Sequence, residues 1–234
     1  MIGNLPAYVP ALFILTTLAA AGFLVYSICQ AKGLTRNAVS VAVIFALWLG
    51  VQAYLAASGF YQNTAAFPPR IFLFGAIPGL LFAIFVCLIF RSAFIQNLPL
   101  RALTLLHVVR VPVELTLYLL FLAKLVPEAM TFAGRNFDIL SGLTAPVVFV
   151  LGFRAGRLNK PLLIVWNVAA LALLINIVAT AILAFPSKLK LLAFDQPNVA
   201  IMYFPFVWLP TVIVPIVFFA HAAALTRLMS RDAK

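Results

Sequence analysis

Charged residues are scarce in this sequence. They make up 9% of its 234 residues, and only five are acidic. Soluble domains carry about 25% charged residues, so a water-exposed globular surface is excluded for most of the chain. Apolar residues make up 65% of the sequence, and no linker or low-complexity tract divides it. Residues 1–234 are therefore predicted to form a single transmembrane domain.

Cysteine is nearly absent, and several catalytic motifs are missing altogether. Cys29 and Cys87 lie inside apolar runs, so neither a structural disulfide nor a thiolate metal site is expected. The sequence has no HExxH, GxSxG or Walker A pattern, which excludes a motif-based assignment as a zincin, serine hydrolase or P-loop enzyme. No metal site is predicted, and the identity of any cofactor stays open.

Basic residues outnumber acidic ones, 16 to five, and give a formal net charge of +11. A nucleic-acid-binding protein gathers basic residues on one face or tail. Here they lie singly or in pairs between apolar runs, so nucleic acid is not expected as a partner. Membrane lipids are the expected partners, because basic residues beside membrane spans attract anionic headgroups.

Long apolar runs predict an all-α polytopic membrane protein, a seven-transmembrane helix bundle. A bilayer core of about 30 Å needs about 20 apolar residues in a helix. The fifth predicted span is the shortest and contains Asp138, Gly142 and Pro146; without it the count would be six. The seven predicted spans are residues 8–29, 38–57, 71–90, 101–126, 137–153, 161–184 and 201–225.

The distribution of basic residues predicts the orientation. Alternate loops carry ten and five basic residues, and the richer side is cytoplasmic by the positive-inside rule. The N-terminus is then outside and the C-terminus inside, in what we expect to be a bacterial cytoplasmic membrane. The richer side has Lys32, Arg36, Arg91, Arg101, Arg154, Arg157, Lys160, Arg227, Arg231 and Lys234, and the other has Arg70, Lys124, Arg135, Lys188 and Lys190.

The fourth span carries a polar stripe. At about 100° per residue, His107, Arg110 and Glu114 fall within an arc of roughly 60°, and Tyr118 extends the same stripe. Ionisable groups at membrane depth are costly and usually mark function. Pro112 leaves the carbonyl of the residue four positions earlier without its helical donor, so a kink beside the stripe is expected. The alternative is a structural ion pair between Arg110 and Glu114 at i, i+4.

Two histidines and an asparagine are predicted at similar depths on the cytoplasmic side. His107 is in the fourth span, Asn167 in the sixth and His221 in the seventh. Two facing histidines could ligate a haem iron axially, whereas lone histidines more often hydrogen-bond within a core or bear a proton. Two histidines without a third ligand make a weak zinc site.

The entry to the fifth span contains further charged residues. Asn136 is a plausible N-cap, and Asp138 would then lie in the first turn, where the helix dipole favours an anion. The alternative is that Arg135 and Asp138 gate the outer mouth of a cavity whose floor is Arg110 and Glu114.

Prolines and glycines suggest irregular packing. Pro205, Pro210 and Pro215 of the seventh span each remove a backbone donor, for which other groups must compensate. The Gly75 to Gly79 spacing is common in helix association and allows a homo-oligomer.

These features favour a membrane protein that binds or transports a small polar or amphiphilic solute through an intramembrane cavity, with proton coupling. Arg110 would bind an anionic group, and Glu114 or His107 would exchange a proton. A membrane-embedded enzyme acting on a lipid or isoprenoid is the main alternative, with Glu114 as general acid. A bis-histidine haem b protein and a structural subunit of a larger complex are further alternatives. The sequence does not decide whether the protein is an enzyme.

Overall fold

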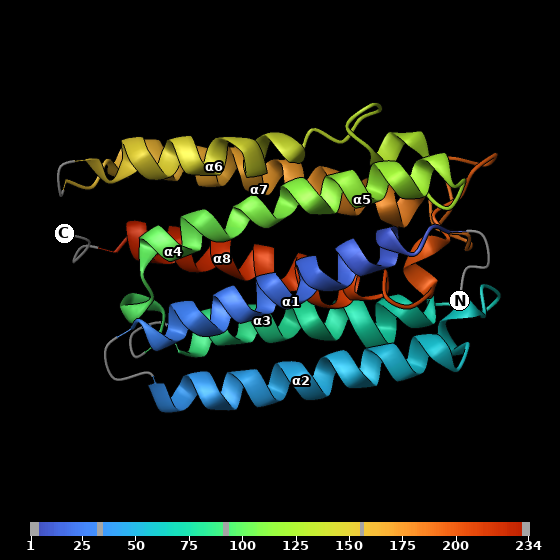
Figure 1. Cartoon of the computed structure of the whole chain (residues 1–234), viewed down its shortest axis with the longest axis horizontal. Helices are drawn as coiled ribbons and strands as arrows, with labels where there is room; N and C mark the ends of the chain where they lie inside the picture. Colours follow the sequence, from blue (N-terminus) through green and yellow to red (C-terminus); the bar gives the residue numbers. More distant parts are fainter. Residues whose placement is uncertain (1–4, 32–34, 91–93, 155–156, 231–234) are drawn as a thin grey trace.

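The computed structural model of the chain describes residues 5–31, 35–90, 94–154 and 157–230, and for residues 35–37 the backbone alone. Within these ranges the regular structure is entirely helical, and seven helical rods lie side by side with alternating directions (Figure 1). α1 begins and α8 ends at opposite ends of the bundle (Figure 1).

The rods are built from eight labelled α-helices. α4 and α5 form one rod, joined by a 3-10 turn at His107–Val109. Single π-helical turns, Phe72–Ala76 and Leu209–Ile213, lead into α3 and α8. The helices are α1 Tyr8–Cys29, α2 Thr35–Ala57, α3 Ile77–Ile89, α4 Leu100–Leu106, α5 Arg110–Leu122, α6 Ile139–Gly152, α7 Lys160–Leu183 and α8 Val214–Leu228.

Six of the rods in the described residues are long and apolar enough to cross a membrane. The chain is therefore described as an integral, multi-pass membrane protein. The remaining rod, α6, has 14 residues, a length of about 21 Å at 1.5 Å per residue. That falls short of the bilayer core, and α6 corresponds to the short fifth span expected from the sequence.

Two predicted spans have different ends in the structure. The fourth, predicted over residues 101–126, stops at Leu122, because the chain turns at Lys124, whose φ of 60° is left-handed. The seventh, predicted from residue 201, begins at Leu209. A 3-10 segment at Ala200–Met202 and turns occupy the residues before it, where prolines remove helical donors.

The orientation remains a prediction. Lys32, Arg91, Arg231 and Lys234 lie outside the described residues, as does the side chain of Arg36.

α8 occupies the centre of the bundle. It contacts α3 on one side and α4 and α7 on the other (Figure 1). In its most apolar 18-residue window 61% of the residues are buried, against 17% in α2 and in the α3 rod. Ala220, Ala223 and Ala224 allow the neighbouring helices to approach it closely. α8 thus separates two regions of the bundle interior.

The two glycines of the Gly75 to Gly79 spacing are used inside the chain. A Cβ on Gly75 would lie 2.6 Å from Cγ2 of Thr211, and one on Gly79 would lie 2.9 Å from Cγ of Pro215. Glycine at both positions therefore allows the α3 rod to pack against the α8 rod. This spacing consequently gives no support to a homo-oligomer.

The missing backbone donor of Pro215 is replaced by a side chain from another helix. Pro215 cannot donate to the carbonyl of Thr211, four residues earlier. Trp48 of α2 donates its Nε1–H to that carbonyl at 2.9 Å. The expectation of compensation is confirmed at this proline.

Pro78 in α3 is compensated in the same way. The carbonyl of Phe74, four residues earlier, accepts from Nε2 of Gln52 at 3.1 Å. The Tyr61 hydroxyl donates to Oε1 of Gln52 at 2.6 Å. α2 is thereby fixed to both proline-containing rods by partly buried hydrogen bonds.

Candidate functional site

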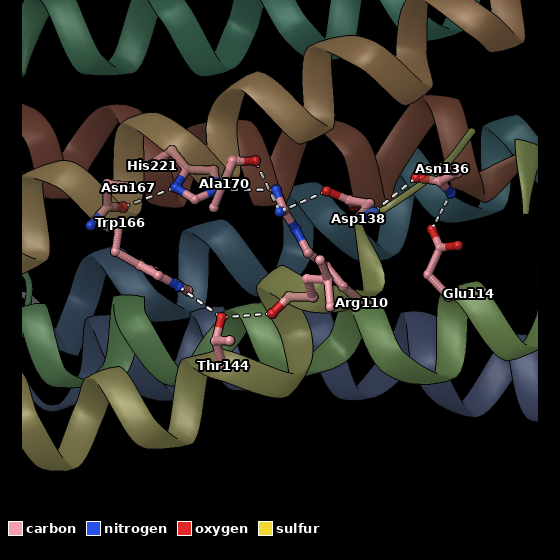
Figure 2. Close-up of polar contacts among 10 residues, drawn as sticks. Arg110, Glu114, Asn136, Asp138, Thr144, Trp166, Asn167, Ala170 and His221 are labelled. Atoms are coloured by element: carbon pink, nitrogen blue, oxygen red, sulfur yellow. Dashed lines mark hydrogen bonds and ion pairs between the residues drawn. The ribbon is translucent and has the colours of Figure 1, made fainter. Parts of the chain in front are cut away.

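A chain of buried polar contacts runs between α5, α6, α7 and α8, with Arg110 at its centre (Figure 2). Nη1 of Arg110 donates to Oδ1 of Asp138 at 2.8 Å and to the carbonyl of Ala170 at 3.1 Å. Nη2 of Arg110 lies 3.0 Å from Nε2 of His221. The guanidinium is only 2% exposed, so this one side chain connects the start of α6 with α7 and α8.

His221 links the centre of the network to α7. Because Nη2 of Arg110 can only donate, Nε2 of His221 must accept. Nδ1 then bears the proton and donates to Oδ1 of Asn167 at 2.9 Å. The amide of Asn167 donates in turn to the carbonyl of Leu163 at 2.8 Å. The contacts thus assign His221 to the neutral Nδ1–H tautomer.

His107 lies against this end of the network without a hydrogen bond. Its ring stacks on His221 with 3.9 Å between centroids and 19° between planes. Trp166 packs against His107 edge-on, at 5.3 Å. His107 is completely buried, and neither ring nitrogen has a partner. His107 and His221 are therefore brought together, as their similar predicted depths implied.

Glu114 lies at the other end of the network. Asn136 donates from Nδ2 to Oε1 of Glu114 at 2.6 Å and to the carbonyl of Met130 at 3.0 Å. Oδ1 of Asn136 accepts from the backbone N–H of Asp138 at 3.0 Å. This one amide joins Glu114 to the Arg110–Asp138 pair. Oε2 of Glu114 is buried and has no partner.

Local backbone features of the fourth span and α6 place these side chains. The 3-10 turn at His107–Val109 immediately precedes Arg110 and coincides with the irregularity expected from Pro112. On α6, a Cβ at Gly142 would lie 2.8 Å from Cγ2 of Val111 and 3.3 Å from Cβ of Arg110. Glycine at 142 lets α6 approach closely enough for Asp138, at its N-terminus, to meet the guanidinium.

The ion pair in the structure differs from the alternative considered from the sequence. Arg110 pairs with Asp138 rather than with Glu114, because α6 presents a carboxylate 2.8 Å away. Arg135 is exposed, whereas Asp138 is buried against Arg110, and a gate formed by these two residues stays a prediction. The carbonyl of Arg135 accepts from Nδ2 of Asn176 at 3.0 Å.

Tyr118 also lies apart from the network. It is half-buried and stacks on Phe132 with 4.8 Å between ring centroids. Of the eight candidate residues, the structure therefore groups six: His107, Arg110, Glu114, Asp138, Asn167 and His221.

Sequence reasoning missed three contributors. Asn136 was expected only as a helix cap, yet it bridges Glu114 and Asp138. The Ala170 carbonyl is a backbone acceptor that no sequence pattern reveals. Trp166 packs on His107 and donates Nε1–H to Oγ1 of Thr144 at 2.9 Å. The one sequence signal for Trp166 was that it is the only tryptophan in an otherwise apolar helix, α7.

Several buried polar atoms around the site lack a hydrogen-bond partner. Native proteins satisfy nearly all such atoms, so each exception calls for a physical explanation. In the described part of the chain they are both ring nitrogens of His107, Nε of Arg110, Oε2 of Glu114 and Oγ of Ser141, whereas Oδ1 of Asn198, also unpartnered, lies away from the site beside the end of α7.

No cluster of three or more His, Cys, Asp or Glu side chains suited to a metal ion occurs among the described residues. The two histidines present stacked ring faces to each other, and Nε2 of His221 already accepts from Arg110. What the site offers chemically is a buried carboxyl, an ion pair and two imidazoles.

Comparison with known protein families gives a match over most of the chain. The model of the family described as "Domain of unknown function (DUF8737)" matches residues 66–229, which include every member of the network. No curated protein and no solved structure matches the chain.

Proposed function

The chain belongs to the DUF8737 family, and we propose that it is a membrane protein that binds or transports a small polar solute and couples this to protonation of Glu114. The observation on which this rests is the contact set of Glu114. Its Oε1 accepts from a neutral amide, and its Oε2 is buried without a partner.

Charge balance supports Glu114 as the proton carrier. The network contains one cation, Arg110, and two carboxyl groups, Asp138 and Glu114. Asp138 neutralises Arg110 directly at 2.8 Å. A buried cluster of low net charge then requires a proton on Glu114, since an uncompensated charge at membrane depth is costly. Oε2 of Glu114 is the free atom able to take that proton.

The solute we propose is one that both donates and accepts hydrogen bonds. Nε of Arg110 can only donate, whereas Oγ of Ser141 can donate or accept. An anionic solute, as first expected, would have to displace Asp138 from the guanidinium. A neutral or zwitterionic solute avoids that competition.

We propose a seven-span topology with the N-terminus outside and the C-terminus in the cytoplasm. The alternating directions of the rods and their odd number support it (Figure 1), as does the ten-to-five bias of basic residues. In this topology α6, although short, counts as the fifth span. A bacterial cytoplasmic membrane is the proposed location.

Two of the three alternatives, the lipid enzyme and the haem protein, receive less support from the geometry. A lipid-processing enzyme needs a slot for a hydrocarbon chain that leads to Glu114, yet the large apolar cavity described below lies on the opposite face of α8. Axial haem ligation needs both imidazole nitrogens to point at one iron, whereas His107 and His221 stack face to face.

The test is solute-driven proton movement. The protein is reconstituted in vesicles that enclose a pH-sensitive dye, and pools of amino acids, carboxylates, amines and sugars are added outside. We expect at least one pool to change the internal pH with the wild type and none with Glu114→Gln. Glu128→Gln is the matched control, because Glu128 is exposed outside the network. An identical response from Glu114→Gln and wild type would refute proton coupling at Glu114.

A further inference from the structure

A large apolar cavity lies on the side of α8 that faces away from the polar network. It has a volume of about 570 Å³ and is lined by residues of α1, α2 and the α3 and α8 rods, with Phe94 at one end. This volume is within the range of about 300–1,000 Å³ that ligand pockets occupy. The outer wall of the cavity includes exposed side chains such as Leu47 and Phe82, so it is an open groove that an apolar occupant can enter from the side of the bundle.

The side chains that line the cavity favour a hydrocarbon occupant. Only Thr211 and Trp48 among the lining side chains carry hydrogen-bonding groups. Oγ1 of Thr211 donates to the carbonyl of Val207 at 2.9 Å, and Nε1 of Trp48 donates to the Thr211 carbonyl. Both donors are therefore already used. A polar solute would lose its hydration there without replacement.

The shape of the cavity fits a chain rather than a compact molecule. Lining residues on α2 run from Val41 to Val51, about 15 Å along the helix axis. Those on the α8 rod run from Thr211 to Phe219, about 12 Å. The long direction is thus parallel to the helices. Leu47 of the outer wall is 66% exposed, so the cavity lies next to the surroundings of the bundle.

The charged side chains at one end of the bundle indicate which lipid headgroup would bind there. Phe94 contacts Phe219 and follows the end of α3, so the cavity extends toward the end of the bundle where α8 finishes (Figure 1). The described charged side chains at that end of the bundle are basic: Arg227 is on α8, which lines the cavity, whereas Arg101, Arg154, Arg157 and Lys160 are on or between α4, α6 and α7, across α8 from it. The described acidic residues, Glu114, Glu128, Asp138 and Asp195, lie nearer the middle or the other end.

From these observations we propose that the cavity binds one acyl chain of an anionic phospholipid whose headgroup lies at the basic end of the bundle. On the cavity wall and beside it, Trp48 and Gln52 of α2 donate hydrogen bonds to the carbonyls of Thr211 and Phe74 and so join α2 to the α8 and α3 rods. The bound chain fills the space between α2 and α8 and holds these helices at their observed spacing.

This site is independent of the proposed function. Phe219 lines the cavity and His221 joins the polar network. Two residues apart on a helix, their side chains point about 160° away from each other. The experiment below therefore uses no residue of the network, and its failure would leave the role of Glu114 untouched.

Native mass spectrometry of the full chain, purified from vesicles of equal parts phosphatidylglycerol and phosphatidylcholine, tests the proposal. We expect one retained phosphatidylglycerol per chain. Ala83→Phe places a ring in the cavity from buried Ala83 and should abolish retention. Ala169→Phe makes the same change on the exposed surface of α7 and should leave retention intact.

Three results would overturn the proposal. Retention by Ala83→Phe equal to that of Ala169→Phe would place the lipid elsewhere. Equal retention of the two phospholipids would show that the site has no preference for an anionic headgroup. Copurification of an isoprenoid from native membranes in place of phospholipid would change the class of occupant.

A second measurement decides the location if Ala83→Phe does not fold. Phosphatidylglycerol with a photoreactive group on its acyl chain is crosslinked to the wild-type protein. We expect labelled peptides to contain lining residues such as Phe82, Val86 and Ile216. Labelling concentrated on α6 and α7 would contradict the proposal.

Discussion

The two faces of α8 contact different kinds of buried surroundings, one polar and the other apolar. One face contacts charged and polar groups that satisfy each other through Arg110, Asp138 and His221. The other borders an apolar cavity, and its few polar side chains are already hydrogen-bonded, Trp48 to the carbonyl of Thr211 and Thr211 to that of Val207. The polar network thus lies on one side of α8, and the apolar cavity lies on the other. Substitutions on the two faces should accordingly have separate effects.

The largest effect is expected at the centre of the polar face. Arg110→Met leaves Asp138 buried without its cation, which should lower the free energy of unfolding by about 3–5 kcal/mol. Reversible unfolding in mixed micelles measures this loss. Arg135→Met, at an exposed arginine, is the control and should change stability by less than about 0.5 kcal/mol.

A second substitution sharpens this prediction. Adding Asp138→Leu to Arg110→Met removes the stranded charge and should recover much of the loss. The ion pair would be unimportant to stability if Arg110→Met behaved like Arg135→Met.

A smaller effect is expected on the apolar face. Trp48→Phe removes the donor to the Thr211 carbonyl and should lower the free energy of unfolding by about 1–3 kcal/mol. Pro215→Ala restores a backbone N–H that can donate to the same carbonyl. Trp48→Phe should therefore have less effect in a Pro215→Ala background. Equal losses in both backgrounds would mean that Trp48 does not compensate for the proline.

Thr144→Val should have a smaller effect again. It removes the acceptor of Trp166 Nε1, an interhelical hydrogen bond on the exposed surface of the bundle, and such bonds contribute about 0.6 kcal/mol on average within membranes. We expect a change of about 0.5 kcal/mol in the free energy of unfolding. A loss comparable to that of Arg110→Met would show that Trp166 and His107 belong to the tightly packed part of the network.

The smallest change in stability is expected for Glu114→Gln. Glutamine keeps Oε1 as the acceptor for Asn136, so the free energy of unfolding should change by less than about 0.5 kcal/mol. A large loss of stability would assign Glu114 a structural role and remove it as a proton carrier.

The sequence was sufficient to predict the helical class and the approximate position of most helices, because apolar runs of membrane length have few alternatives. It also identified six of the network residues, since ionisable residues in apolar runs are conspicuous. The end of the fourth span was wrong because the left-handed turn at Lys124 has no glycine to signal it. The start of the seventh was wrong because residues 200–207 are mostly apolar yet form a 3-10 segment and turns instead of an α-helix.

The partners within the network could not be predicted. The Arg110–Glu114 spacing fits a pair on one helix, but Asp138 reaches Arg110 only because Gly142 lets α6 approach. Such a contact depends on how two helices pack against each other. The periodicity within each helix carries no information about that packing. The apolar cavity was invisible for the same reason, because its lining residues resemble any lipid-facing or core residues.

Infrared spectroscopy of the buried carboxyl group is the most direct test of the central claim. At neutral pH the wild type in vesicles should show the carbonyl stretch of a protonated, non-aqueous carboxylic acid, retained in Glu128→Gln and lost in Glu114→Gln. Addition of a solute pool that moves protons should shift or remove this band. A spectrum in which the band is absent, or survives unchanged in Glu114→Gln, would contradict the assignment of Glu114 as the proton carrier.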